Sequence, residues 1–323
     1  NYDMTQLIEK HDVDLSELDQ VAMDYIRMAS EGELWALPLY SDTLVLYYNK
    51  ELFDKFGVDY PEDGMTWEEI SALAERMTRN EDDVQYYGFT VEWLPHTFNM
   101  NQLSLALVDS ETNTSNLTKD FGWTEFFQTT YVNMLGGSEL NTFIETNNRF
   151  PNRQDFINQN VAMMTGLATY TNEIPEFYED LIDWDMVSLP TFQSHPDTGP
   201  QVYPAYVGIA QTSQNKDAAM AVLKHLVSED FQNVVSQYTG GIPVLEQSKD
   251  TFVQNSQSTG KNLEAVYYHP SAPISTKTKF DNHVSNRIRV LIPNVIAGTM
   301  DLNTALRTAS EEANQDITAQ LAE

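Results

Sequence analysis

The chain has 323 residues, of which 41% are hydrophobic and 20% charged, a balance that suits one large or two smaller globular domains with a buried core. Its 48 acidic against 18 basic residues give a formal net charge of −30, which argues against nucleic acid and an anionic membrane surface as partners. The chain contains no run of about 18 apolar residues, the length that a membrane span needs. The absence of cysteine favours an exported protein built without disulfides.

The first 57 residues predict helices and then a pair of strands. Residues 1–30 carry apolar side chains at helical spacing in a polar background. Residues 34–38 form a short apolar run, and residues 43–48 are β-branched or aromatic, which indicates a buried strand. A short helix is expected over residues 49–56, with Gly57 at its C-terminal end.

A capping box is predicted at Thr66 and Glu69, where each side chain can satisfy a backbone amide of the other residue. The helix that it opens is expected to run to about residue 78, and residues 87–91 predict another strand. The stretch 98–182 is expected to be mostly helical. Its expected breaks lie at residues 113–116, 136–137 and 147–151.

The remaining sequence alternates short strands with amphipathic helices. Strands are predicted at residues 187–190 and 207–210. Helices are predicted at residues 213–227, 230–238, 280–298 and 301–322. Strands that alternate with longer helices are typical of an α/β fold.

Three segments together resemble one known family. They are Leu37-Pro38 with Leu46-Tyr47-Tyr48-Asn49-Lys50-Glu51-Leu52-Phe53 and Met65-Thr66-Trp67-Glu68-Glu69, then Val161-Ala162-Met163-Met164-Thr165-Gly166, and finally residues 209–228 with Asn215-Lys216-Asp217-Ala218-Ala219. In this order the chain resembles the family 1 extracellular solute-binding proteins of bacterial ABC sugar importers, whose best-known member is the maltose-binding protein. The resemblance covers essentially the whole chain.

The resemblance implies an α/β fold of the two-lobed, periplasmic-binding-protein-like type II, which closes on its ligand by hinge motion. An N-terminal lobe is expected from residues 1–40 and about 206–245, and a C-terminal lobe from about 45–202 and 250–323. Hinge crossovers are expected near residues 41–44, 203–206 and 244–250. The resemblance implies much more strand and helix before the segment matched at Leu37-Pro38 than this chain carries, so we expect the N-terminal lobe to be truncated.

The resemblance also implies the function. Such a protein is the substrate-binding component of an ABC transporter, which captures a mono- or oligosaccharide in an interlobe cleft and delivers it to permease subunits in the membrane. It implies a bacterial protein that is extracellular, either a cell-surface lipoprotein or periplasmic, and monomeric. We expect no enzymatic activity, no cofactor and no metal site, since zinc-ligand spacing and a calcium loop are both missing from the sequence.

Two other functions remain open on the sequence alone. A binding protein of the same fold could take a non-sugar solute, and the charge of −30 would suit a cationic one. A carbohydrate-active enzyme with two catalytic carboxylates is a weaker alternative, because no local motif nominates the pair. The 36 aromatic residues (16 Tyr, 15 Phe, 5 Trp) favour a sugar, whose C–H-rich ring faces stack on aromatic rings.

Asp42 is the first candidate for ligand binding, because it lies between two apolar strands where the family is expected to place a sugar-binding carboxylate. The alternative is a turn residue that caps backbone amides. Tyr40 and Ser41 in the same loop are further candidates.

Trp93 and Glu92 follow the strand at 87–91, at a strand end where the resemblance implies sugar contacts. A tryptophan that packs in the core is the alternative for Trp93, and core packing is the favoured interpretation of Trp123.

Five more residues complete the predicted site. Thr165 and Tyr170 lie where the family often carries a stacking tryptophan, which this chain lacks. Tyr203 and Tyr206 flank a proline at the predicted crossover, where we expect one of them to face the ligand. Gly240 can admit a close ligand approach, although a helix C-cap is the favoured interpretation.

Overall fold

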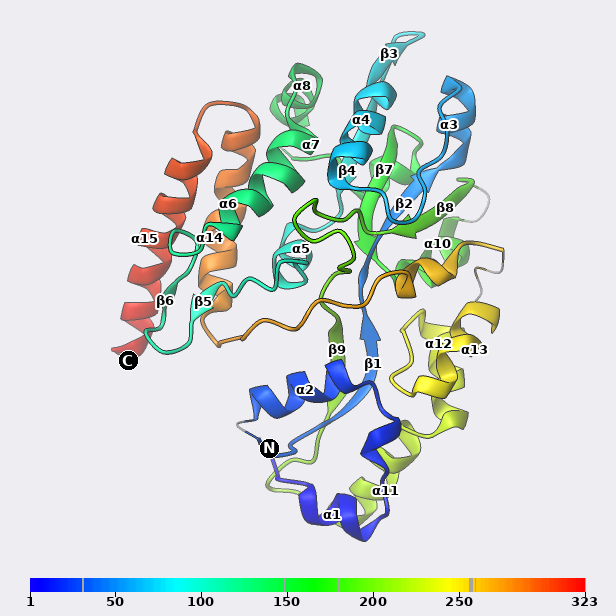
Figure 1. Ribbon diagram of the computed structural model, residues 1–323, viewed down its shortest axis with the longest axis vertical. Helices are drawn as coiled ribbons and strands as arrows, with labels where there is room; N and C mark the ends of the chain where they lie inside the picture. The colour runs from blue at the N-terminus through cyan, green and yellow to red at the C-terminus, as the bar shows by residue number, and fades with distance from the viewer. Residues whose placement is uncertain (31, 148, 179–180, 256–257, 259, 323) are drawn as a thin grey trace. The chain divides into compact units, whose positions relative to one another are not determined.

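The computed structural model describes residues 1–322 except 31, 148, 179–180, 256–257 and 259. The chain divides into two compact units (Figure 1). Unit 1 comprises Asn1–Thr43, Leu167–Glu179 and Val202–Val266, and unit 2 comprises Leu44–Gly166, Asp180–Gln201 and Tyr267–Glu323. These ranges put residues 167–179 and 250–266 in unit 1, whereas the predicted lobes put them in the other part. The predicted lobe and hinge boundaries stay predictions.

Unit 1 is built around one antiparallel pair of strands, β1 (Leu37–Asp42) and β9 (Tyr203–Val207). Its helices are α1 (Thr5–Lys10), η1 (Leu15–Glu17), α2 (Gln20–Ala29), α10 (Tyr170–Tyr178), α11 (Lys216–Leu226), α12 (Glu229–Thr239), η3 (Glu246–Ser248), α13 (Lys249–Asn255) and η4 (Leu263–Tyr267), which ends at the boundary with unit 2. Apolar residues of α1, α2, β1 and α11 form its hydrophobic core.

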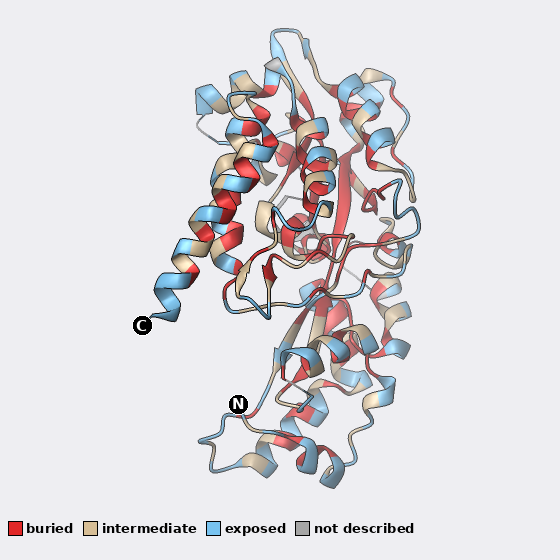
Figure 2. Ribbon diagram, turned by 60° about the vertical axis from the view of Figure 1, so that its left-hand side comes forward, coloured by how far each residue is buried: buried red, intermediate tan, exposed pale blue. Residues whose placement is uncertain are grey.

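Unit 2 contains a five-stranded sheet in the order β3–β4–β7–β2–β8. The strands are β2 (Leu44–Asn49), β3 (Arg79–Glu81), β4 (Val84–Val91), β7 (Val161–Leu167) and β8 (Trp184–Ser188). Strands β4 and β7 are parallel, whereas β2 and β8 are antiparallel. All six residues of β2 are buried, and Figure 2 shows the sheet strands of this unit mainly in the colour of buried residues.

Helices pack around this sheet and form the rest of unit 2. They are α3 (Lys50–Phe56), α4 (Trp67–Met77), α5 (Leu94–Asn99), α6 (Gly122–Phe127), the π-helix η2 (Gln128–Val132), α7 (Asn133–Leu135), α8 (Ser138–Asn147), α9 (Arg153–Ile157), α14 (Asp281–Ile296) and α15 (Leu302–Leu321). The last two run side by side (Figure 1). A small hairpin, β5 (Val108–Asp109) and β6 (Thr114–Ser115), packs against α15.

Close packing of α4 on β4 depends on a glycine. A Cβ atom at Gly88 of β4 would lie 1.9 Å from the carbonyl oxygen of Ala74 on α4. Only a residue without a side chain fits at this position.

Several predicted elements are confirmed. The capping box is present, with the Thr66 hydroxyl accepting from the Glu69 amide and the Glu69 carboxylate accepting from the Thr66 amide. Gly57 ends α3 in the left-handed conformation, at φ 61°. The buried strand, both closing helices and the core position of Trp123 are also as expected.

Two predictions of secondary structure are wrong. The stretch 98–182 is not mostly helical, because it contains β7 in the middle of the sheet and the β5–β6 hairpin. The short apolar run at 161–167 is continuous, so the spacing of its hydrophobic residues does not distinguish a buried strand from a buried helix. The strand predicted at 207–210 lies four residues earlier in the structure, where β9 spans Tyr203–Val207.

Candidate ligand-binding site

The end of β4 in unit 2 presents the most exposed tryptophan among the residues that the structure describes. β4 ends at Val91, Glu92 follows, and Trp93 is the N-cap residue of α5. The backbone amide of Glu92 donates to the carbonyl oxygen of Thr165 on β7, at 3.1 Å, so the two parallel strands are joined up to this point. Ligands of open α/β sheets bind outside the carboxyl ends of such strands.

Trp93 leaves 47% of its surface exposed, although tryptophan is usually largely buried. The guanidinium carbon of Arg289, on α14, lies 5.5 Å from the centre of the Trp93 ring. Glu92, the residue before Trp93 in the chain, is half-buried. Burial lowers the pKa of nearby His96 below its usual value, and the Glu92 carboxylate partly offsets this, so His96 is neutral at pH 7.

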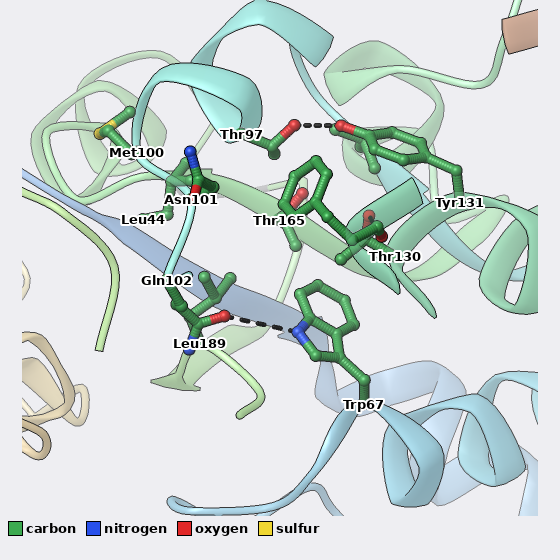
Figure 3. Close-up of a pocket in the computed structure, with 12 residues that line it drawn as sticks. Leu44, Trp67, Thr97, Met100, Asn101, Gln102, Thr130, Tyr131, Thr165 and Leu189 are labelled. Atoms are coloured by element: carbon green, nitrogen blue, oxygen red, sulfur yellow. Dashed lines mark hydrogen bonds between the residues drawn. The ribbon is translucent and has the colours of Figure 1, made fainter. Parts of the chain in front are cut away.

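Thr165 lies inside unit 2 rather than on its surface. It is 1% exposed, and its hydroxyl has no hydrogen-bond partner among the described residues. The side chain lines an apolar cavity of about 10 Å³, the size that one water molecule needs. Figure 3 shows Thr165 in this cavity, with a Thr97–Tyr131 hydrogen bond on one side and a Trp67–Gln102 hydrogen bond of 3.4 Å on the other.

In unit 1, Asp42 is the last residue of β1 and its side chain is buried. The Thr169 hydroxyl donates to its Oδ2 atom at 2.7 Å. The backbone amides of Thr43 and Thr169 donate to its Oδ1 atom at 2.8 and 3.3 Å. Both carboxylate oxygens therefore have partners within unit 1.

Burial raises the pKa of Asp42 from 3.8 to about 6. The hydrogen bonds from Thr169, Thr43 and Ala168 favour the charged form and act in the opposite direction. Desolvation is thus the larger effect, and Asp42 changes charge in a mildly acidic range.

The register of β1 and β9 separates the two candidate tyrosines. Tyr203 is paired with Asp42, and Tyr206 is paired with Pro38. Tyr206 instead packs near Tyr25 of α2, with the ring centres 6.2 Å apart. Tyr203 is therefore the one beside Asp42.

Gly240 ends α12 in the left-handed conformation, at φ 67°, as the C-cap interpretation predicts. A Cβ atom there would lie 2.7 Å from the carbonyl oxygen of Thr169. The side-chain amide of Asn172 satisfies its hydrogen bonds when its oxygen faces the end of α12. In this orientation the oxygen accepts from the backbone amides of Gly240 at 2.8 Å and Thr239 at 3.1 Å. Tyr170, which opens α10, is 6% exposed.

The predicted residues are thus divided between the two units. Unit 1 carries Tyr40, Ser41, Asp42, Tyr170, Tyr203, Tyr206 and Gly240, and unit 2 carries Glu92, Trp93 and Thr165. Within unit 1, the end of β1, the start of α10 and the turn after α12 converge. Sequence reasoning missed Thr169, although it lies just beyond the matched segment at 161–166. It also missed Arg289, for which no sequence signal exists.

Neither a metal site nor a membrane helix is found in the described part of the chain. No three His, Asp or Glu side chains there are grouped so that they could hold a metal ion. No helix there combines the length and the apolar character that crossing a bilayer requires.

Comparison with known proteins agrees with this architecture. A family model for bacterial extracellular solute-binding proteins matches residues 1–233. The chain belongs to this family. It is therefore a bacterial extracellular solute-binding protein, and its family consists of binding proteins rather than enzymes.

Individual relatives are distant. The sn-glycerol-3-phosphate-binding periplasmic protein UgpB of Escherichia coli K12 is 23% identical over 326 residues, which cover 94% of this chain and 71% of the relative. The ABC substrate-binding protein Lmo0181 from Listeria monocytogenes, solved with cycloalternan, superposes with a TM-score of 0.76 at 19% identity, over 98% of this chain and 80% of that one. Maltose-bound MalE3 of T. maritima gives 0.66 at 18% identity, over 97% and 79%. The predicted fold class, a two-lobed periplasmic-binding-protein-like α/β fold, is confirmed.

Proposed function

We propose that this chain binds a mono- or oligosaccharide and delivers it to the permease of an ABC importer. The family supports the role as a solute-binding component. Two structural neighbours are described with cycloalternan and with maltose, which favours a saccharide.

Trp93 is the observation that carries the proposal. Its ring is half-exposed at the carboxyl end of β4, and Glu92, the preceding residue in the chain, carries a carboxylate at the same strand end. A flat aromatic face next to a hydrogen-bond acceptor provides the two contacts that a sugar ring offers, its C–H-rich face and its hydroxyls. An exposed tryptophan without such a ligand would leave apolar surface in water.

Unit 1 carries a second set of candidate groups. Tyr203 is 56% exposed and lies beside Asp42 on the neighbouring strand. Because both oxygens of Asp42 already accept hydrogen bonds from the chain, its main task is to fix the Thr169 segment, while its remaining lone pairs accept from ligand hydroxyls. Tyr40 and Ser41 belong to the same strand end.

We further propose that the protein works as a monomer outside the cytoplasmic membrane, either lipid-anchored or periplasmic, and that it does not alter its ligand. Proteins of this fold class close on their ligands by hinge motion. The corresponding expectation is a smaller radius of gyration by X-ray scattering when ligand is saturating. An unchanged scattering curve at saturation would contradict closure.

A phosphorylated polyol is the second candidate ligand. The similarity to an sn-glycerol-3-phosphate-binding protein over 94% of this chain favours it. The formal charge of −30 opposes it, because the field of such a protein repels anions.

Thermal unfolding in the presence of separate ligands tests the proposal. The panel is maltose, maltotriose, mannotriose, cycloalternan, sn-glycerol 3-phosphate and spermidine. A ligand at 100 times its Kd adds roughly 2.7 kcal/mol, which raises the melting temperature by a few degrees. A rise with saccharides alone supports the proposal. A rise only with glycerol phosphate or only with spermidine replaces it by an anionic or a cationic ligand, and no rise with any saccharide contradicts it.

A further inference from the structure

Arg289 is the cation that faces the ring of Trp93. It lies on α14, which packs against α5, and its guanidinium carbon is 5.5 Å from the ring centre. A guanidinium within about 6 Å of an aromatic face is attracted by the ring's negative electrostatic potential, and tryptophan is the strongest such acceptor.

Arg289 has few other interactions. No carboxylate of the described residues forms an ion pair with it, and its Nε atom is buried without a hydrogen-bond partner there. Arg287, two residues earlier on the same helix, behaves differently, since it bonds to Asp316 at 2.7 Å and to Glu312 at 3.1 Å. Although the chain has 48 acidic residues, the contact that the structure gives Arg289 is with a tryptophan ring.

The helix that presents Trp93 is also held at its other end. Lys277 donates from Nζ to the carbonyl oxygen of Asn99, the last residue of α5, at 2.7 Å, and to the hydroxyl of Ser275 at 2.9 Å. With the backbone of α5 fixed in this way, the main freedom left to Trp93 is rotation of its own side chain.

We infer that Arg289 is a positioning residue for ligand binding, which holds the ring of Trp93 in one orientation and leaves the opposite face for the ligand. This inference rests on the proposed function. A half-exposed side chain that must be ordered by its ligand reduces the affinity, and fixing it beforehand removes that cost. Arg289 thus strengthens binding without a requirement to touch the sugar.

The test compares Arg289→Met, Arg289→Lys and the control Arg287→Met. Methionine keeps an unbranched side chain of similar reach but removes the charge, whereas lysine keeps a cation that can lie over the ring. Arg287→Met removes an arginine from the same helix without touching Trp93 and reports the general effect of such a change on stability.

The first measurement needs no ligand. The near-UV circular dichroism of each protein minus that of its Trp93→Phe counterpart isolates the signal of Trp93. We expect Arg289→Met to lose at least about half of this signal, because a ring free to rotate has little induced asymmetry, and we expect the other two variants to keep it. A Trp93 signal in Arg289→Met equal to that of the wild type overturns the inference.

The second measurement is the affinity for maltotriose and mannotriose as probes. We expect Arg289→Met to bind about 3- to 30-fold more weakly and Arg289→Lys to recover most of the loss. Equal affinity of the wild type and Arg289→Met overturns the inference. If the wild type binds no saccharide, the proposed function fails, and the first measurement still decides whether Arg289 positions the ring.

Discussion

The hydroxyl of Thr169 donates a 2.7 Å hydrogen bond to the carboxylate of Asp42, and this bond joins segments of unit 1 that are 127 residues apart in the chain. Asp42 ends β1, and Thr169 lies just before α10. Thr43 and Thr169 also donate backbone amides to the same carboxylate. A single buried acid therefore links the end of β1 to the residue that precedes α10.

We expect Asp42→Asn to change the pH dependence of stability. The pKa of Asp42 is about 6 in the folded protein, above its ordinary value of 3.8, so the folded state binds more protons between these values. The wild-type free energy of unfolding should therefore fall as the pH rises through this window. Asparagine does not ionise, and the variant should be more stable at pH 7 by up to about 3 kcal/mol and similar at low pH. Urea unfolding across the pH range measures this.

Asp301→Asn is the matched control. Asp301 is an exposed N-cap that accepts from the Thr304 amide at 2.9 Å, and the hydrogen bonds from Thr304 lower its pKa. Its contribution is present at neutral pH and is lost as the pH falls, which is the opposite direction. Parallel pH profiles for the wild type and Asp42→Asn would show that the burial of Asp42 has no energetic consequence.

Trp93→Ala should weaken saccharide binding about 10-fold or more, because central aromatic contacts dominate binding energies. The melting temperature should change by only a few degrees, since half of the side chain is already exposed. Isothermal calorimetry and thermal unfolding separate the two effects. Phe121→Ala, at an aromatic residue of unit 2 that is 88% exposed, should leave affinity unchanged. Equal affinities of the wild type and Trp93→Ala would remove the main support for a sugar site at β4.

Tyr203→Ala should reduce the affinity for the saccharide, whereas Tyr206→Ala should not. The two side chains are similarly exposed, at 56% and 53%, but only Tyr203 is paired with Asp42. They therefore control for each other in the same calorimetric titration. A larger loss for Tyr206→Ala than for Tyr203→Ala would place ligand contact on the side of Tyr25 instead.

Gly88→Ala should destabilise the protein by at least about 2 kcal/mol, because the new methyl group would meet the backbone of α4 at 1.9 Å and push the helix from the sheet. Gly298→Ala is the control. It lies at φ 70° with open space around its Cβ position, so only the backbone conformation opposes alanine, at about 1 kcal/mol. Chemical denaturation compares them, and an equal cost for both would argue that α4 moves freely.

Local signals in the sequence predicted the elements whose ends are set by local chemistry. The Thr66–Glu69 capping box and the Gly57 stop depend only on neighbours in the chain, so their positions follow from the residues themselves. The strand β7 could not be recognised in this way, because its partner β4 and its burial are properties of the folded sheet.

The candidate site shows the same limit. Resemblance and strand ends nominated Asp42 and Trp93, and the structure adds what surrounds them. Thr169 contacts Asp42, and Arg289 contacts Trp93, only in the folded chain. No spacing in the sequence predicts either contact. The register of β1 and β9, which distinguishes Tyr203 from Tyr206, is likewise set by long-range pairing.

The interleaving of the two units along the chain means that both are completed only late in synthesis. Leu37 in β1 pairs with Val207 in β9, and unit 1 is complete only when residue 266 has been made. Unit 2 in turn needs its last helices, α14 and α15. Contacts this distant in sequence form slowly. A growing chain therefore remains without a finished core for most of its synthesis, and its apolar segments stay exposed to solvent during that time.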